Sequence, residues 1–274
     1  MTTPLRSIEV PLKAGGTLAA MEAGAGPTLL CVHGFPLDHS MWHHQLTGLA
    51  AHARVIAPDL RGFGGSTGTP PVESLDDFAS DLVELLDHLG IHEPVVFCGL
   101  SMGGYIAFRF ASIAADRLRG LVFCDTRAAA DSPEASANRH RMVEIVRRGG
   151  VKTVADAMHG KLFAADTYVE LAAIVEDTRN VMLTARGETV AAALLAMAAR
   201  PDSTPALSQL PCPSLWLCGS EDSITPATEM QANAERARDS QFVEIAAAGH
   251  MAPLEQPAAV NKAIERFLFS LEQR

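Results

Sequence analysis

The sequence predicts an α/β protein with a mostly parallel sheet and helices on both faces of that sheet. Two features of the chain lead to this expectation. Short apolar runs, each long enough for one buried strand, alternate with segments whose apolar residues recur at helical spacing. The chain also has 274 residues, 48% of them hydrophobic, which is enough to bury one large core.

The first third of the chain begins with a hairpin signal and then starts the alternation. Strands are expected at residues 8–12, 17–21, 28–32 and 54–57, with Ala14-Gly15-Gly16 as the turn between the first two. Helices are expected at 41–51 and 75–89. Ser40 is the expected N-cap of the earlier helix, and Ser74 with Asp77 forms a capping-box-like start for the later one.

The alternation continues through the middle of the chain and returns at its end. Further strands are expected at 94–98, 121–124, 214–218 and 242–246, and further helices at 104–111, 225–238 and 258–271.

Residues 127–209 interrupt this pattern. They contain no strand-like run, are rich in alanine, and are broken at Gly149-Gly150, Gly160 and Gly187, with a helix at 191–199 stopped by Pro201. We therefore expect a core domain formed by residues 1–126 and 210–274. Residues 127–209 are expected to form a helical cap domain over the strand ends, where open α/β sheets bind ligands.

Charge and cysteine content exclude several classes of protein. The net charge is −10, with 22 Lys and Arg against 32 Asp and Glu, so we expect no nucleic-acid partner and no anionic membrane surface as a partner. Four of the five cysteines fall inside predicted strands and are expected to be small buried hydrophobic residues in a reducing compartment. The segment 1–6 does not resemble a targeting signal, and no apolar stretch is long enough to span a bilayer, so a soluble cytoplasmic protein is expected.

The run Gly99-Leu100-Ser101-Met102-Gly103 places a serine between a predicted strand and a predicted helix. At such a junction the chain makes a sharp turn, and glycines flank the serine because side chains there would collide with the neighbouring strand and helix. The hydroxyl is then exposed near a helix N-terminus that favours developing negative charge. We interpret Ser101 as a nucleophile; the alternative is an ordinary N-cap serine.

Three more motifs follow the predicted strands at corresponding places: His33-Gly34-Phe35-Pro36, Gly219-Ser220-Glu221-Asp222 and Ala248-Gly249-His250. With the serine motif, and in this order, they make the chain similar to the α/β-hydrolases over about residues 8–269. The resemblance implies the α/β-hydrolase fold, a mostly parallel eight-stranded sheet with an inserted helical cap. We expect no cofactor and no metal.

The resemblance also implies roles for single residues. His250 is expected to take the proton of Ser101, and Asp222 to orient the imidazole, in the chain order serine, aspartate, histidine that this fold uses. Asp125 is the alternative acid, because some members carry it after the earlier strand. The backbone N–H groups of Phe35 and Met102 are expected to form the oxyanion hole.

Two other features are interpreted as structural. His33 invites a metal or second-base role, but we expect it to bond loop backbone. The loop Asp59-Leu60-Arg61-Gly62-Phe63-Gly64-Gly65-Ser66 lacks the spacing and the lysine of a phosphate-binding loop. The resemblance implies that this loop is structural, with Asp59 and Arg61 as local partners.

The predicted function is hydrolysis of a small carboxylic ester or lactone through an acyl-enzyme, in the manner of small carboxylesterases and enol-lactonases. Related enzymes cleave carbon–carbon bonds or make peracids with the same three residues, and these activities stay open as alternatives. A third alternative is a small-ligand-binding protein that keeps the fold without catalysis. The oligomeric state is not predicted.

Overall fold

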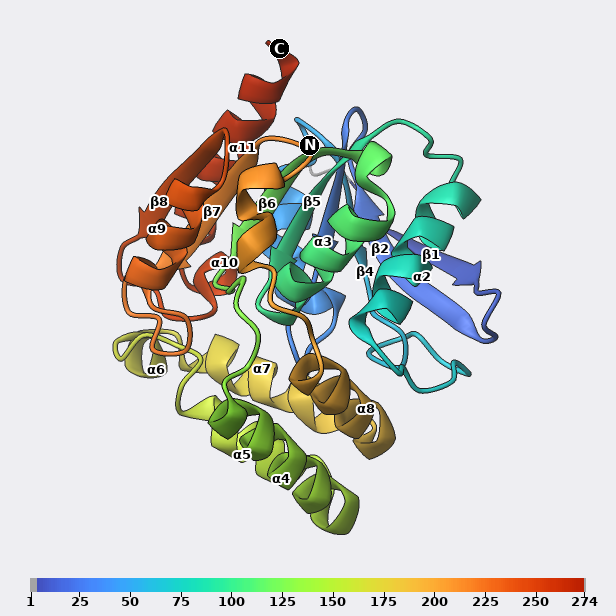
Figure 1. The fold of residues 1–274 in the computed structure, drawn as a ribbon, viewed down its shortest axis with the longest axis vertical. Coiled ribbons are helices and arrows are strands. Elements are labelled where there is room, and N and C mark those ends of the chain that lie inside the picture. The colour runs from blue at the N-terminus through green and yellow to red at the C-terminus, as the bar shows by residue number, and fades with distance from the viewer. Residues whose placement is uncertain (1–3, 274) are drawn as a thin grey trace.

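An eight-stranded sheet runs through the centre of the protein (Figure 1). The computed structural model describes residues 4–273, so Met1 to Thr3 of the segment tested for a targeting signal lie outside the described residues. The strand order is β1-β2-β4-β3-β5-β6-β7-β8; β2 runs antiparallel to both of its neighbours, β1 and β4, and all the other neighbouring pairs are parallel. The predicted α/β-hydrolase fold is confirmed. The strands are β1 (Arg6–Pro11), β2 (Thr17–Ala23), β3 (Thr28–Val32), β4 (Arg54–Pro58), β5 (Val95–Leu100), β6 (Leu118–Cys124), β7 (Ser214–Gly219) and β8 (Ser240–Ile245).

The strand β6 begins three residues before the predicted position. Arg119 and Gly120 break the apolar run in the sequence, yet both lie in the strand. Gly120 is needed there because a Cβ atom at this position would lie 2.8 Å from a methyl group of Leu271. The helix that contains Leu271 packs so closely on the sheet that the strand has no room for a side chain.

Helices cover both faces of the sheet, as predicted. One face carries α2 (Leu75–His88), α3 (Met102–Ile113) and α9 (Ala227–Arg236), whereas α1 (His43–Gly48) and α11 (Pro257–Glu272) cover the other. The short helical segments of the described chain are η1 (His39–Trp42), η2 (Ala115–Arg117), η3 (Thr204–Gln209), which ends the segment 127–209, and α10 (Ala252–Glu255).

Side chains of each central strand alternate between the two faces. Phe123 and Trp216 stack on each other on the α2–α3–α9 side, with ring centroids 4.3 Å apart. Their chain neighbours Val122 and Leu217 point to the α1–α11 side. The strands are buried on both faces, which is why they are continuous apolar runs in the sequence.

Helix starts follow the capping prediction at one of two positions. Ser74 and Asp77 form the predicted capping box of α2. The prediction that Ser40 caps the preceding helix is wrong, because the chain first forms the 3₁₀ segment η1. Its N-cap is Asp38, whose carboxylate accepts the Ser40 N–H at 2.9 Å.

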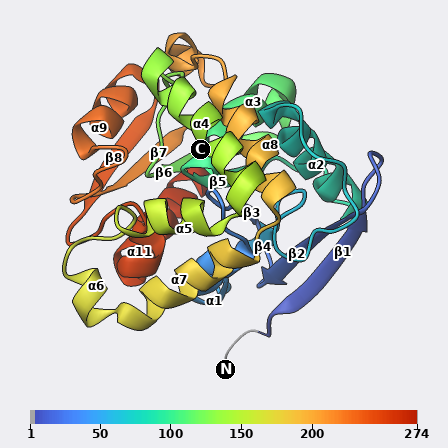
Figure 2. The ribbon, with the colours of Figure 1, turned by 90° about the horizontal axis from the view of Figure 1, so that it is seen from below.

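Within the described residues, five α-helices lie between β6 and β7, in the segment 127–209, which we call the helical insertion. Figures 1 and 2 show that they form one layer across the end of the sheet where the parallel strands finish. Three of their boundaries lie at or beside the predicted glycines, whereas the break between α6 and α7 lies at Leu171; α8 starts at Gly187, four residues before the predicted helix. The helices are α4 (Pro133–Gly149), α5 (Lys152–His159), α6 (Thr167–Glu170), α7 (Ala172–Thr184) and α8 (Gly187–Ala198).

The two chain segments that join the insertion to the sheet are bonded to each other. The buried guanidinium of Arg200, in the returning segment, donates to Asp131 Oδ1 at 2.6 Å and to the Ala129 carbonyl at 2.9 Å, both in the outgoing segment. Its guanidinium carbon lies 4.1 Å from the ring centroid of Tyr105 in α3. Arg200 therefore holds both connections against the core.

No single helix among residues 4–273 is both long and apolar enough to cross a membrane; α7 and α8 reach that length only together, and they are bent by 97°.

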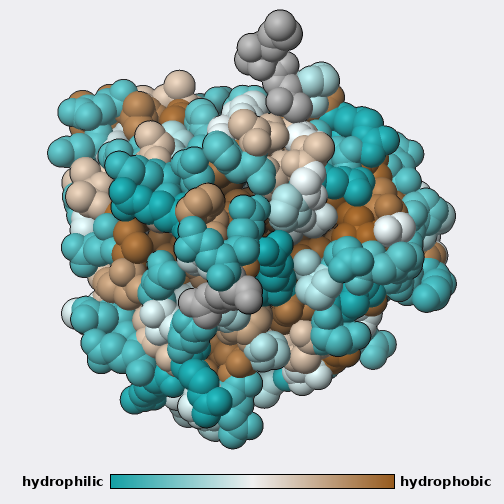
Figure 3. All heavy atoms as spheres, turned by 90° about the horizontal axis from the view of Figure 1, so that it is seen from above, coloured by the Kyte–Doolittle hydropathy of each residue, from teal (hydrophilic) through white to brown (hydrophobic). Residues whose placement is uncertain are grey.

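The face of the molecule opposite the insertion mixes hydrophilic and hydrophobic residues (Figure 3). Phe269 in α11 is 61% exposed, whereas Phe123 is fully buried.

Substitution of Phe123 by alanine is expected to lower the free energy of unfolding by about 3–5 kcal/mol, because it leaves a cavity between Trp216 and Phe108. Phe269→Ala serves as the matched control and should change it by less than about 0.5 kcal/mol. Urea denaturation of the three proteins measures both values. Equal losses in the two variants would contradict this account of the core.

Candidate active site

Ser101 lies at a strained turn between β5 and α3. Its backbone φ is +52°, a left-handed conformation that is unfavourable for a residue with a side chain. The flanking glycines explain how the chain makes this turn. A Cβ atom at Gly99 would lie 2.3 Å from the Gly103 carbonyl oxygen, and one at Gly103 would lie 2.2 Å from that of Val32. The close approach holds the half-buried Ser101 at the first turn of α3.

His250 and Asp222 meet at the same end of the sheet. Nδ1 of His250 lies 2.8 Å from Asp222 Oδ2, and both side chains are buried. Asp222 follows β7, and His250 follows β8. Because these parallel strands are neighbours, the loops after them are adjacent. A Cβ atom at Gly219 would lie 2.1 Å from the Gly249 carbonyl oxygen, which shows how tightly the two loops pack.

Asp222 has hydrogen-bond donors on both carboxylate oxygens. Oδ1 accepts the N–H groups of Ile224 at 2.7 Å and Thr225 at 3.0 Å, and Oδ2 accepts the Thr225 hydroxyl together with His250. Burial alone would raise the pKa of Asp222, but the charge of His250 and these hydrogen bonds outweigh it and hold the pKa below its usual value. A charged Asp222 favours the tautomer with the proton on Nδ1, which leaves Nε2 of His250 as an acceptor.

Asp125, the alternative acid, has a different environment. Its Oδ1 accepts the Gly219 N–H at 2.8 Å, while Oδ2 is buried without a hydrogen-bond partner among the described residues. Burial and the nearby Asp222 carboxylate raise the pKa of Asp125 well above its ordinary value. The environment of Asp125 thus favours its neutral form, and its carboxyl bonds the backbone of β7, whereas Asp222 bonds His250.

The loop after β3 lies beside Ser101. A Cβ atom at Gly34 would lie 2.7 Å from Leu100 Cδ2, 3.3 Å from the Leu100 carbonyl oxygen and 3.4 Å from the Ser101 Cβ atom, so a side chain here would crowd the turn. The N–H groups of Phe35 and Met102 make no hydrogen bond within the described residues and remain available to a ligand. Likewise, no hydrogen bond joins the Ser101 hydroxyl to His250 within that range.

The features interpreted as structural have local partners. His33 Nδ1 lies 2.8 Å from the Gly34 carbonyl, and its Nε2 accepts the Leu60 N–H at 2.9 Å. Burial lowers the pKa of His33, which keeps it neutral. Asp59 accepts the N–H groups of His39 and Gly65, both at 2.7 Å.

Arg61 has a partner further along the chain. It forms a buried ion pair with Asp81 of α2.

Two residues that bond to the candidate site were given no role from the sequence alone. Thr225, buried, donates to Asp222 through both its N–H and its hydroxyl. Glu255, 4% exposed, accepts backbone N–H groups on either side of His250, and burial raises its pKa despite these hydrogen bonds. In the sequence, Glu255 is marked only as a carboxylate that directly follows the stretch 249–254, which contains no Asp, Glu, Lys or Arg.

Two groups of side chains bring three metal-ligating atoms within 4.8 Å of one another: Asp38, His39 and Asp59, and Asp125, Cys218 and Asp222. Protein donors already engage the carboxylates of both groups. His39 Nδ1 bonds Asp59 at 2.7 Å, and Asp222 has the four donors described above. The exception among the described residues is Asp125 Oδ2, which has no hydrogen-bond partner.

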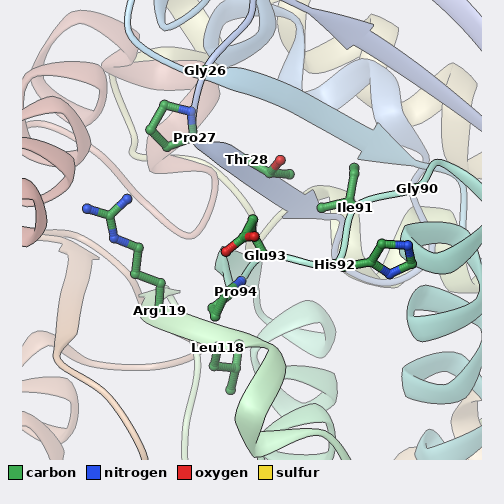
Figure 4. A pocket seen from close by; sticks show the side chains of 10 residues that line it. All are labelled: Gly26, Pro27, Thr28, Gly90, Ile91, His92, Glu93, Pro94, Leu118 and Arg119. Carbon is green, nitrogen blue, oxygen red and sulfur yellow. The ribbon is translucent and has the colours of Figure 1, made fainter.

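A pocket of about 760 Å³ lies at the opposite end of the sheet. Its walls include Thr28, Pro94 and Leu118, at the starts of three parallel strands, and Figure 4 shows their side chains around it together with Glu93 and Arg119. Ser101, Asp222 and His250 all follow strand ends. The pocket is therefore separate from the site described here.

Comparison with known proteins agrees with this geometry. A family model described as the alpha/beta hydrolase fold matches residues 27–257. The chain belongs to the α/β-hydrolase family. It is 29% identical over 239 residues to 3-oxoadipate enol-lactonase 2 of Acinetobacter baylyi, with 87% of each chain covered.

Two solved structures extend the comparison. This α/β-hydrolase superposes on a thermophilic esterase from Thermogutta terrifontis with a TM-score of 0.93 and 46% identity, covering 97% of this chain and 99% of the esterase. It superposes on the enol-lactonase from Burkholderia xenovorans LB400 with a TM-score of 0.83 and 27% identity, covering 97% of each chain. The chain is thus a hydrolase-fold enzyme with esterases and enol-lactonases among its relatives.

The raised pKa of Asp125 predicts a pH-dependent stability. Above the ordinary value of 3.8 the unfolded chain has lost this proton while the folded protein keeps it, so this group's contribution to stability falls as pH rises. Asp125→Asn keeps an oxygen for the Gly219 N–H but cannot ionise. The difference in free energy of unfolding between this variant and the wild type should therefore shift in favour of the variant as pH rises above 3.8, by at most about 1.4 kcal/mol per pH unit. Urea titrations across this range measure the difference, and a constant difference would contradict the assignment.

Proposed function

We propose that the enzyme hydrolyses small carboxylic esters or lactones through an acyl-enzyme formed on Ser101. The observation that carries this proposal is the buried 2.8 Å hydrogen bond between His250 and Asp222, at the sheet edge where Ser101 occupies its strained turn. A serine hydroxyl is a weak nucleophile at neutral pH and needs an adjacent base. His250, oriented by Asp222, supplies that base.

In the first step the Ser101 oxygen attacks the acyl carbon, and Nε2 of His250 takes the hydroxyl proton. The Asp222 carboxylate stabilises the imidazolium that forms. The proton then passes to the leaving alcohol oxygen, which leaves the acyl group on Ser101. Water releases the acid by the same steps, with His250 again as the base. The hydroxyl and the imidazole need to come together only with substrate bound, since catalytic hydrogen bonds often tighten at that stage.

The carbonyl oxygen gains negative charge in the tetrahedral intermediate. The N–H groups of Phe35 and Met102, which have no partner among the described residues, are the proposed donors to this oxygen. In related chemistry, each donor of this kind lowers the activation free energy by about 3–4 kcal/mol. The positive end of α3 adds to the effect.

The proposed substrate class is supported by the relatives, which are named as an esterase and as enol-lactonases. The helical insertion, as the proposed cap domain, lies across the strand ends and limits the size of the acyl and alcohol groups. Carbon–carbon bond hydrolysis and perhydrolysis would use the same three residues. A panel of short esters, lactones and diketones distinguishes these activities by product.

Wild-type enzyme is expected to release p-nitrophenol from p-nitrophenyl acetate with a burst, because acylation releases p-nitrophenol and the acyl-enzyme accumulates when its deacylation is the slower step. A fluorophosphonate probe should label Ser101, and Ser101→Ala should lose both the burst and the label. Mass spectrometry of the labelled peptide locates the modification. If neither the wild type nor Ser101→Ala differs from buffer on the whole panel, and no label appears, the proposed function is wrong.

Asp222→Asn is expected to lower kcat by about 10⁴-fold, because an amide in place of the carboxylate stabilises the wrong imidazole tautomer. Asp125→Asn, the matched control on the neighbouring strand, should keep kcat within about threefold of the wild type, since Asp125 bonds backbone and not His250. Steady-state kinetics on one ester compares the two variants. The opposite ranking would transfer the orienting role to Asp125.

A further inference from the structure

We propose that Glu255 is a positioning residue that sets the place of His250 by joining the His250 loop to the helical insertion. This inference rests on the proposed function, in which His250 is the base. Glu255 ends α10, five residues after His250, and its side chain is 4% exposed. A carboxylate buried to this degree requires hydrogen-bond donors, and here the donors come from two separate parts of the chain.

One carboxylate oxygen holds the loop that carries the imidazole. Glu255 Oε1 accepts the Gly249 N–H at 2.8 Å and the Met251 N–H at 3.2 Å. These N–H groups belong to the two residues on either side of His250. Fixing both restricts the backbone from which the imidazole projects toward the strand ends.

The other oxygen holds the helical insertion. Glu255 Oε2 accepts the Ala164 N–H and the Thr167 hydroxyl, both at 2.7 Å. Ala164 lies in the connection between α5 and α6, and Thr167 is the first residue of α6. The same side chain therefore contacts the insertion and the His250 loop.

Two further contacts bring these segments together. The Met251 N–H is shared between Glu255 and the Leu162 carbonyl, which it meets at 3.1 Å. A Cβ atom at Gly249 would lie 2.6 Å from the Ala164 nitrogen, so the loop packs directly on the connecting segment. Displacement of that segment would remove donors from the carboxylate and a neighbour from the loop. The position of His250 thus depends on the insertion being in place.

The substitution Glu255→Gln tests the hydrogen bonds of this side chain without changing its size. Glutamine has the same shape but a single acceptor oxygen, so its NH₂ group must face either the Gly249 and Met251 N–H groups or the Ala164 N–H. We expect Glu255→Gln to lower kcat by about tenfold or more with KM changed less than about threefold, because a misplaced base slows the chemical step.

The matched control is Glu22→Gln, which neutralises a buried carboxylate in β2, paired there with Arg6 and Arg54. It should keep kcat within about twofold of the wild type. Steady-state kinetics and thermal unfolding are measured on all three proteins with p-nitrophenyl acetate. A folded Glu255→Gln enzyme with wild-type kcat and a wild-type pH profile would overturn the positioning role.

Hydrogen–deuterium exchange tests the connection without any substrate. Thr167→Val removes one donor on the insertion side, and we expect peptides covering residues 162–167 and 247–255 both to exchange faster, by similar factors. The control Thr184→Val removes an exposed hydroxyl that bonds only its own helix, and should change neither peptide.

Unchanged exchange at 247–255 in Thr167→Val would overturn the proposed connection, whatever the activity and whether or not Glu255→Gln folds. A wild-type enzyme that neither hydrolyses esters nor takes up the fluorophosphonate label would instead refute the proposed function. The exchange experiment would still decide whether Glu255 connects the two segments.

Discussion

The close approach of three backbone segments around Ser101 is the constraint on which the site depends. The turn after β5, the first turn of α3 and the loop after β3 come so near one another that a side chain at Gly34, Gly99 or Gly103 would meet neighbouring atoms. This packing forces Ser101 into a left-handed conformation and keeps it there. The surrounding sheet supplies the stability that such strain requires.

Three buried carboxylates at this end of the sheet show that the number of hydrogen-bond donors does not by itself set the pKa of an acid, because a nearby cationic group also contributes. Asp222 and Glu255 each accept four hydrogen bonds, whereas Asp125 accepts one from the Gly219 N–H. Only Asp222 also faces a group that becomes cationic, and its pKa is lowered, while burial raises the other two. Three carboxyl groups in one small region thus differ in pKa because their neighbours differ.

The sequence predicted the fold where local signals and tertiary environment agree. Buried parallel strands are apolar on both faces, so β3 was predicted from Thr28 to Val32, as observed. The start of β6 was missed because Gly120 is required by the close packing of Leu271, a contact distant in the chain. Ser40 was misassigned because the capping pattern does not distinguish a 3₁₀ turn from an α-helix.

The candidate site was predictable only where a motif marks a strand end. Ser101, Asp222 and His250 follow strands and carry recognisable neighbours. Glu255 has no such motif, and its contacts with Ala164 and Thr167 join positions about 90 residues apart. Such pairings depend on how the insertion folds back on the sheet, which residue spacing does not encode.

The attachment of the helical insertion has an evolutionary consequence. Its outgoing segment follows the end of β6, and its returning segment runs back to the start of β7, which lies at the opposite end of these parallel neighbouring strands. The two segments are bonded to each other beside the insertion, with the Ser203 N–H donating to the Ala128 carbonyl at 2.9 Å. A different helical block whose two ends meet at this bonded pair of segments would leave the pairing of the strands unchanged. Recombination at this junction would replace the insertion, and so change which substrates can enter the site, while the sheet stays the same.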